Sequence, residues 1–420
     1  MTASESVRVR DAPWLTEGPL AKLLAVLDRD GEEARVVGGA VRNVLLGQAP
    51  GEIDVATTAV PPEVIGRAGA AGFKPVPTGI EHGTVTVVVD HVPFEVTTLR
   101  EDVETFGRRA VVRFGRDWRA DALRRDFTIN ALSMTRDGAV HDYAGGLADL
   151  RARRVRFIGD AATRIAEDYL RILRFFRFHA AYGEGLPDRA GLDACIRARD
   201  GLDRLSRERV RMELVKLLVA PHVVPTLAVM TEAGLLDPVL GGVPLLASLS
   251  NMTKVESTCR LEPSPVRRLG ALAVMVTEDA ERLWQRLRLS NAEHERLASM
   301  ADGWWRVAPA GDAAARALLY RLGPERYVDR VLVAWVRSPA RDDDADWHAM
   351  ASLAERWTAP AFPLKAADLM ARGVPKGPGL GAALAAAEAA WIAADFPRDR
   401  AALAAIADDA ARNAAGAAIS

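Results

Sequence analysis

The sequence predicts an α+β head at the N-terminus, followed by a region built of helices alone. From about Arg35 to Val140, short β-like runs alternate with short helical ones. After Arg151 the β-like runs stop, and apolar residues recur at helical spacing between Gly and Pro breaks. A chain of 420 residues, 49% of them hydrophobic and 26% charged, is large enough for two or more domains.

The head is expected to contain four strands and two helices. The strands are predicted at 34–39 (ARVVGG), 52–58 (EIDVATT), 84–90 (TVTVVVD) and 93–100 (PFEVTTLR), and the helices at 40–47 and 61–69. The last two strands follow one another closely and predict a hairpin. Beyond the head, helices are expected at 165–183, 206–221 and the Ala-rich segment 383–396.

Composition narrows the possible environments and partners. The formal net charge is only −1, so a nucleic-acid partner must meet a local basic patch, and residues 151–182 carry eight arginines against three acids. A solvated helix face with internal ion pairs is the alternative for that segment. Cys195 and Cys259 lie far apart without metal-ligand spacing, which argues against zinc and against a disulfide scaffold. No apolar run approaches the roughly 20 residues of a membrane helix, so we expect a cytoplasmic protein without membrane attachment.

Two carboxylates stand two residues apart in the strand predicted at 52–58. In an extended strand Glu52 and Asp54 share one face, where they repel each other unless a cation lies between them. Just upstream, Gly38 and Gly39 join a predicted strand to a helix, whose free N–H groups suit a phosphate, with Arg42 one turn further on. Glycines used only for a tight turn are the alternative for that pair.

Six motifs in order resemble one known family. They are GGAVRNVLLG, EIDVATT, FEVTTLR, DALRRDFTINAL, DYAGGLADL and EDYLRILRFFRF, and together they span roughly Val36 to Phe178. The sequence resembles the class II tRNA nucleotidyltransferases, the CCA-adding enzymes, and their bacterial poly(A) polymerase relatives. The resemblance implies a polymerase-β-like nucleotidyltransferase head at 1–150, then an all-α neck at 151–220, a body at 221–355 and a tRNA-binding tail at 356–420.

The resemblance also implies the catalytic carboxylates. Glu52 and Asp54 correspond to the metal ligands, and Glu95 in FEVTTLR to the third catalytic carboxylate on a neighbouring strand. The expected cofactor is Mg²⁺, which takes carboxylate and phosphate oxygens. The family usually carries Asp-x-Asp, whereas this chain has Glu52 at the first position, with a side chain one methylene longer.

Further motif positions are implied to bind the nucleotide. Asp126 and Asn130 are expected near the ribose and Arg125 near the phosphates, although a helix-end ion pair would also account for this segment. The full set of expected nucleotide-binding residues is Gly38, Gly39, Arg42, Arg125, Asp126, Asn130, Asp168, Arg171, Arg174 and Arg177.

The segment 167–178 is expected to select the base. Cytosine and adenine both present an amino donor beside an unprotonated ring nitrogen, so Asp168 can accept from the former while Arg171 donates to the latter. Uracil and guanine present the reverse pattern. Arg174 and Arg177 are then left for phosphates. An Asp–Arg surface pair at i,i+3 is the alternative interpretation.

Two further segments resemble family features. The Arg-rich stretch 99–121 is similar to the family's flexible loop, and its length favours full CCA addition over partial addition. In the tail, 363–381 resembles the family's C-terminal segment, where Lys376, Gly377 and Gly379 are expected to meet a tRNA phosphate, or else to form a glycine turn between two helices.

The sequence thus predicts an enzyme that adds C, C and A to the 3′ end of tRNA from CTP and ATP without a template. A poly(A) polymerase, an A-adding or CC-adding relative, and a noncatalytic RNA-binding protein with a decayed head remain alternatives. The predicted partners are tRNA and the two nucleotides, and the sequence indicates no protein partner.

Overall fold

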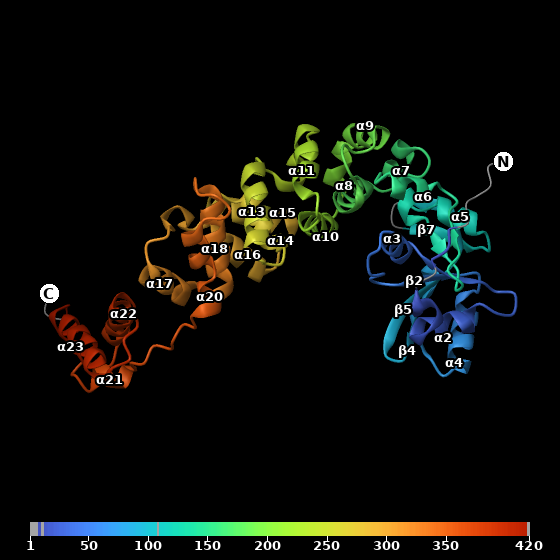
Figure 1. The fold of residues 1–420 in the computed structure, drawn as a ribbon. Helices are drawn as coiled ribbons and strands as arrows, with labels where there is room; N and C mark the ends of the chain where they lie inside the picture. Colours follow the sequence, from blue (N-terminus) through green and yellow to red (C-terminus); the bar gives the residue numbers. More distant parts are fainter. Residues whose placement is uncertain (1–6, 10–11, 107–108, 418–420) are drawn as a thin grey trace. The chain divides into compact units, whose positions relative to one another are not determined.

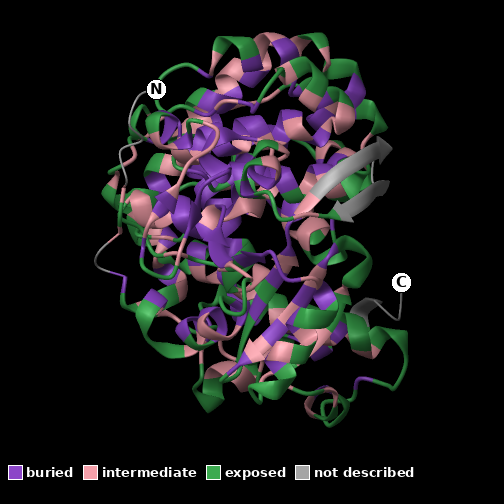
Figure 2. Cartoon of the chain, turned by 90° about the vertical axis from the view of Figure 1, so that its right-hand side faces the viewer, coloured by how far each residue is buried: buried purple, intermediate pink, exposed green. Residues whose placement is uncertain are grey.

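The computed structural model describes residues 7–9, 12–106 and 109–417. The chain forms two compact units, Met1–Val239 and Leu240–Ser420 (Figure 1). Figure 2 shows buried segments in the interior and exposed positions on the outer turns of the helices. In the described ranges, no helix is both long and apolar enough to cross a bilayer.

The first unit is built on a mixed sheet of seven strands in the order β3-β4-β5-β2-β1-β8-β9. These strands are β1 (Ala34–Val37), β2 (Asp54–Thr57), β3 (Lys74–Gly79), β4 (Thr84–Val89), β5 (Val92–Thr98), β8 (Ser133–Met134) and β9 (Val140–His141). The helical elements of this part are α1 (Pro13–Thr16), α2 (Gly18–Leu27), α3 (Gly39–Leu45), α4 (Pro61–Ala70), η1 (Ile80–His82), α5 (Trp118–Leu123), η2 (Thr128–Asn130) and α6 (Gly146–Arg151).

One face of the sheet is apolar and packed. Along β4, Val85, Val87 and Val89 are fully buried and alternate with partly exposed residues, as a strand with one covered face requires. Helices α2 and α4 pack against this strand. The hairpin expected at 84–100 is confirmed, because β4 and β5 pair as antiparallel neighbours.

Strand register brings three distant segments together at one place. β2 pairs antiparallel with β1, where Val37 lies opposite Asp54, and parallel with β5, where Asp54 lies opposite Glu95. Since Val37 is the last residue of β1, the turn at Gly38 begins directly beside Asp54. The sheet therefore positions the glycine turn and two carboxylates side by side.

Two expectations for the head need correction. Strand β2 begins at Asp54, so Glu52 lies in a bend before the strand and does not belong to it. The Arg-rich stretch 99–121 contains a two-stranded sheet of β6 (Arg100–Phe106) and β7 (Arg109–Phe114) in place of a loop. The residues between these strands, 107–108, lie outside the described part of the chain.

The rest of the first unit is helical, as the sequence predicts. Its elements are α7 (Ala161–Glu167), α8 (Leu170–Tyr182), α9 (Arg189–Arg197), η3 (Arg199–Arg204), α10 (Arg207–Leu218) and α11 (Val223–Glu232), and α12 (Asp237–Leu240) spans the boundary between the units. Helix α8 packs against α10 and α11. Its rings Phe175 and Phe178 contact Phe127 of the head, with centroids 6.2 and 5.3 Å from that ring.

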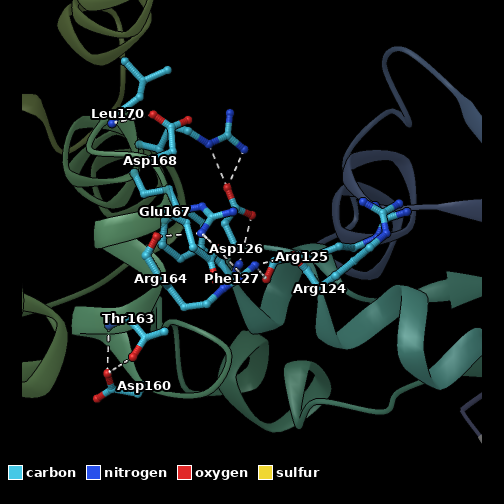
Figure 3. Close-up of polar contacts among 12 residues, drawn as sticks. Arg124, Arg125, Asp126, Phe127, Asp160, Thr163, Arg164, Glu167, Asp168 and Leu170 are labelled. Carbon is cyan, nitrogen blue, oxygen red and sulfur yellow. Dashed lines mark hydrogen bonds and ion pairs between the residues drawn. The ribbon is translucent and has the colours of Figure 1, made fainter. Parts of the chain in front are cut away.

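The helix expected at 165–183 is interrupted. Asp160 caps the start of α7 by accepting from the Thr163 N–H at 2.8 Å, and the helix ends at Glu167 (Figure 3). Asp168 has an extended backbone, with φ of −157° and ψ of 108°, and α8 begins two residues later. The apolar periodicity continues across this break, which is why the sequence suggests a single helix.

The second unit consists of helices in its described residues. They are α13 (Leu246–Thr258), α14 (Pro265–Ala273), α15 (Thr277–Leu287), α16 (Asn291–Ala301), η4 (Trp304–Arg306), α17 (Asp312–Leu322), α18 (Pro324–Arg337), α19 (Ala345–Ala351), α20 (Leu353–Arg356), α21 (Ala366–Met370), α22 (Pro378–Ala393) and α23 (Arg400–Ala417). Buried ion pairs hold part of this unit, since Arg267 bridges Glu256 at 2.8 Å and Asp329 at 3.1 Å. Leu369, Ala383 and Ala407 belong to a separate apolar cluster of α21, α22 and α23.

Candidate active site

A cavity of about 790 Å³ lies in the first unit, between the glycine turn and carboxylates of the head and helices α8 and α10. It collects these sequence-predicted residues: Gly38, Gly39, Arg42, Glu52, Asp54, Arg125, Asp126, Asn130, Asp168, Arg171, Arg174 and Arg177. Glu95 does not line the cavity. The sequence reasoning missed Arg124, Leu170, Phe178, Ala181, Tyr182, Arg209, Lys216 and Val219, which also line it.

The glycine turn has a backbone that other residues adopt at a cost. Gly38 has φ of 69° and ψ of −122°, and a Cβ at this position would lie 3.2 Å from the Arg125 Nη1. Helix α3 begins at the next residue, so N–H groups that have no partner within the helix lie at the turn, where Gly38 and Gly39 line the cavity. The turn can therefore receive a phosphate group at the helix start.

Three carboxylates gather at the adjoining end of β2. Asp54 and Glu95 are paired across neighbouring parallel strands and both are exposed. Loss of hydration, then the negative charges of Glu95 and Glu52, raise the pKa of Asp54, while Arg125 opposes this rise. Negative charge is thus concentrated here at a cost that a bound cation would relieve.

The donor set suits a hard divalent cation. The side chains of Glu52, Asp54 and Glu95 accept no hydrogen bond and form no ion pair with any residue that the structure describes, so their carboxylate oxygens are free to act as ligands. In the described ranges no group of three or more His, Cys, Asp or Glu residues could hold a metal ion by itself. The carboxylates supply part of a coordination shell, and phosphate oxygens are the natural complement.

Arg42 is a buried cation held by neutral groups. It donates to the Asn130 Oδ1 at 2.5 Å and to the Tyr182 hydroxyl at 2.7 Å, and its guanidinium lies 3.9 Å from the centre of the Tyr182 ring. Its side chain also donates to the neighbouring Asn43. Burial lowers the pKa of Arg42. No carboxylate of the described chain pairs with it directly, so its charge is available to an anionic ligand.

Asp126 and Asn130 form a fixed pair beside it. Arg174 donates to the Asp126 Oδ2 from Nε at 2.7 Å, and Asn130 donates to the Oδ1 at 3.3 Å. Burial alone would raise the pKa of Asp126, but Arg174 and these hydrogen bonds hold it below its usual range. Asp126 is therefore an ionised acceptor, and it has no ion pair with Arg124, which pairs with Asp121 instead.

Asp168 points toward α10 through an ion pair. Both of its oxygens accept from Arg209, at 3.2 and 2.6 Å, in a two-pronged arrangement. Its Oδ1 also accepts from the Leu170 N–H at 3.1 Å. A carboxylate has about four acceptor positions, so about one position of Asp168 remains for a ligand. No ion pair joins Asp168 to Arg171 in the described structure, so the i,i+3 surface pair is not formed.

Arg171 is anchored on the α7 side of the break. Its Nη1 donates to the Arg164 carbonyl at 2.6 Å and to the Glu167 carboxylate. The same carboxylate binds the Arg164 side chain at 2.6 Å (Figure 3). No hydrogen bond to a described residue occupies its Nε or Nη2. Arg171 is thus oriented while retaining donors for a ligand.

The remaining arginines of α8 form ion pairs with a carboxylate of α10. Arg177 pairs with Glu213 at 2.7 Å, and Arg174 reaches the same carboxylate at 3.8 Å in addition to Asp126. From the sequence, both arginines are expected to bind phosphates. In the structure, protein carboxylates largely neutralise their charges.

The tail residues belong to the other unit. Gly377 precedes α22, which begins at Pro378, so the expected helix start is present. Lys376, Gly377 and Gly379 are exposed, and nothing lies within 4 Å of an added Cβ at either glycine. The glycine turn between α21 and α22 is present as well, so phosphate binding here stays a prediction.

The missed residues come mainly from the last turns of α8 and from α10. Their only sequence signal is the helical face of SRERVRMELVKLLV, on which Arg209, Lys216 and Val219 fall at i, i+7 and i+10. Arg209 is 41 residues away from Asp168, and no local motif links the two.

The glycine turn, the carboxylates beside it and the polar pocket between the sheet and helices α8 and α10 are the arrangement expected of a nucleotidyltransferase. Comparisons agree: residues 34–156 match the family described as the poly A polymerase head domain, and residues 190–249 match a probable RNA and SrmB-binding site of polymerase A. CCA tRNA nucleotidyltransferase 1, mitochondrial, of Mus musculus is 34% identical over 391 residues, which are 90% of this chain and 86% of the relative.

Other relatives give the same result. The CCA-adding enzyme of Bacillus cytotoxicus is 39% identical over 217 residues, which are 51% of this chain and 53% of the relative. A crystal structure of the Bacillus stearothermophilus CCA-adding enzyme in complex with CTP aligns with a TM-score of 0.74 and 26% identity, covering 94% of this chain and 97% of that one. The chain therefore belongs to the family of CCA-adding tRNA nucleotidyltransferases. The predicted α+β fold class and the family resemblance are both confirmed, and enzymes of this family generally depend on divalent metal ions.

Proposed function

We propose that this chain adds C, C and A to the 3′ end of tRNA, taking the nucleotides from CTP and ATP and releasing pyrophosphate. The observation that carries this proposal is that one cavity joins the glycine turn, two carboxylates, Asp126 with Asn130, and Asp168 with Arg171. The same cavity therefore offers groups suited to the phosphates, to the ribose and to the base of a nucleotide.

At the phosphate end, the chain binds and orients the nucleotide. The N–H groups at the start of α3 and the unpaired charge of Arg42 hold the triphosphate. Glu52 and Asp54 are the proposed ligands of Mg²⁺, with Glu95 beside them as the third catalytic carboxylate. When bound, Mg²⁺ would stabilise the charge on the phosphates and favour ionisation of the attacking 3′-hydroxyl.

Glu52 can serve although the family usually has aspartate there. Because it lies in the bend before β2, its backbone is not fixed by the strand ladder and its longer side chain has room to reach the cavity that it lines. Its negative charge is felt at Asp54. This favours a working site over a decayed one.

The parts of the pocket proposed to hold the ribose and the base would select the nucleotide. Asp126 and Asn130 are placed to contact the ribose hydroxyls, and Arg125 lies beside the glycine turn for the phosphates. Asp168, held by Arg209, would accept from the amino group of C or A, and Arg171, held by Glu167, would donate to the ring nitrogen. Uracil and guanine would present a donor to Arg171 and an acceptor to Asp168.

The four-part division is proposed on the same basis. The head at 1–150 and neck at 151–220 form the pocket, and the body at 221–355 and tail at 356–420 would bind the rest of the tRNA. The cytoplasm remains the expected location, while the Mus musculus relative is named as mitochondrial.

One incubation separates the candidate activities. Purified full-length chain is mixed with tRNA that lacks its 3′ CCA, Mg²⁺, and CTP, ATP or both, and the product ends are sequenced. We expect two C residues with CTP alone and CCA with both nucleotides. Long A tails from ATP alone would identify a poly(A) polymerase, one missing nucleotide type would identify a partial enzyme, and tRNA binding without incorporation would identify a noncatalytic protein.

A further inference from the structure

Lys216 differs from the other cations that line the cavity. Arg124, Arg125, Arg171, Arg174, Arg177 and Arg209 each pair with a carboxylate, and Arg42 donates to neutral acceptors. Lys216 has no hydrogen bond, ion pair or ring contact to any residue within the described ranges, and it is exposed. No described group therefore neutralises the charge of Lys216.

Lys216 lies on a defined stripe of α10. Arg209, Met212, Lys216 and Val219 follow one another at steps of three and four residues, which is one face of a helix. Leu214, Leu217 and Leu218 form the buried face. On the stripe, Met212 and Val219 are exposed by 57% and 37%, so apolar surface flanks the free ammonium on both sides.

The stripe runs from the base-reading end of the pocket to the phosphate end. Arg209 contacts Asp168 ahead of α8, and Glu213 contacts Arg174 and Arg177 further along α8, so the two helices run in the same direction. One turn later, Lys216 is level with the last turn of α8, where Tyr182 holds Arg42. Lys216 therefore stands at the rim of the phosphate end.

We propose that Lys216, with Met212 and Val219, binds the 3′-terminal segment of the tRNA primer: the ammonium binds a backbone phosphate and the apolar side chains contact the adjoining nucleoside. The inference rests on the proposed function, because nucleotidyl transfer requires the primer end to meet the α-phosphorus of the incoming nucleotide. The primer must accordingly enter at the phosphate end, where Lys216 lies.

The incoming triphosphate is a poorer fit for this stripe. Its phosphates already have the helix start at Gly39 and the buried charge of Arg42. A triphosphate carries no apolar surface at that end, whereas an RNA strand alternates phosphates with bases that contact methionine or valine.

The test is the tRNA affinity of Lys216→Met, which removes the charge and keeps most of the side-chain length. Binding of tRNA that lacks CCA is measured from low to high salt without nucleotide. We expect the dissociation constant to rise about three- to tenfold at low salt, and the slope of log Kd against log salt to fall by about 0.7 to 0.9, as for one lost phosphate contact. KM for CTP should stay within about twofold of the wild type.

Matched variants make the result decisive. Lys74→Met removes an exposed lysine from β3, outside the cavity, and should leave both slope and Kd unchanged. Lys216→Arg should restore the slope, and Val219→Asp should weaken tRNA binding through repulsion while keeping the wild-type melting temperature.

Two outcomes would overturn the inference. A slope unchanged in Lys216→Met would show that no phosphate is bound there, and a raised CTP KM with normal tRNA binding would assign Lys216 to the incoming nucleotide. If the wild-type chain binds tRNA but incorporates nothing, the proposed function fails, and the salt slope still decides whether Lys216 contacts RNA.

Discussion

The carboxylates that line the pocket are of two kinds: some have their charge neutralised by an arginine of the protein, and others have no such partner and are free to bind a ligand. Asp126 and Asp168 each have an arginine partner, whereas Glu52 and Asp54 have none among the described residues. Unpaired like charges are unfavourable for folding, so their presence at one point of the sheet indicates a functional role.

Asp54 gives the first prediction. Its raised pKa means that the folded state favours the protonated form, so the ionised carboxylate lowers stability at pH values above its ordinary value of 3.8. Without divalent metal, Asp54→Asn should melt at a higher temperature than the wild type at pH 7, and this gain should vanish as the pH falls below about 4. Thermal melts across this pH range measure it.

The same variant tests the metal assignment. Asp54→Asn should lose nucleotide incorporation while binding tRNA normally, and added Mg²⁺ should raise the melting temperature of the wild type only. Near-normal incorporation by Asp54→Asn would refute the assignment of Asp54 as a metal ligand.

Tyr182 gives a second prediction at this scale. Its hydroxyl and ring both hold Arg42, so Tyr182→Phe keeps the ring contact and removes one hydrogen bond to a charged group. We expect KM for CTP and for ATP to rise equally, by about three- to tenfold, because Arg42 is proposed to contact the phosphates rather than the base. Steady-state kinetics with each nucleotide on the matching primer measure it. Unequal effects on the two nucleotides would place Arg42 at the base.

At the scale of secondary structure, the break between α7 and α8 positions Asp168 and Arg171, which are proposed to read the base. Asp168 lies in the break and pairs with α10, and Arg171 pairs back to α7. A single helix would have put both side chains on one continuous face, where they could have paired with each other. The interruption keeps both available to a ligand.

A glycine supports this break, and its replacement gives a third prediction. Gly201 in η3 packs under Tyr169, and an added Cβ would lie 1.9 Å from the ring. Gly201→Ala should lower the free energy of unfolding by about 1 to 3 kcal/mol and reduce kcat/KM for CTP by moving the residue next to Asp168. Calorimetry and kinetics measure the two effects.

Gly66→Ala is the matched control. Gly66 lies in α4 with nothing within 4 Å of an added Cβ, so the substitution should be neutral or stabilising by about 0.4 to 1 kcal/mol. If Gly201→Ala behaved in the same way, the contact with Tyr169 would not support the break.

The sequence predicts the elements of the head better than the partners of the site. Alternating apolar residues locate β4 and β5, and the glycine pair locates the start of α3, because these signals are local. The break at Asp168 is hidden because apolar spacing continues through it. Arg209 is hidden too, since its contact with Asp168 depends on how α10 packs against α8.

At the scale of the whole molecule, we propose that nucleotide transfer takes place in the first unit and that most of the contacts with tRNA are made by the second unit. Every residue that lines the cavity belongs to the unit Met1–Val239, and the tail residues belong to the unit Leu240–Ser420. Changes in the tail should therefore affect the binding of tRNA and leave the binding of CTP unchanged.

Truncation before Leu364 tests this division and is the fourth prediction. It should raise KM for tRNA by about tenfold or more, because one or more phosphate contacts are lost. KM for CTP should stay within about twofold of the wild type. Because Trp391 and Phe396 pack against Tyr320, truncation also uncovers apolar surface, so Lys376→Met is the control that keeps the unit intact. An unchanged KM for tRNA in the truncated chain would remove the tail from the binding surface.

The proposed enzyme selects C and A with protein side chains and without a nucleic-acid template. The most direct measurement is the ratio of kcat/KM for CTP to that for UTP on a tRNA primer, with ATP to GTP as its parallel, in Asp168→Asn and Arg171→Ala. A two-point base contact is worth roughly 1 to 3 kcal/mol, so each ratio should fall by on the order of ten- to a hundredfold. If both variants lose activity but keep the wild-type ratios, Asp168 and Arg171 only support the neck, and the pocket does not read the base through them.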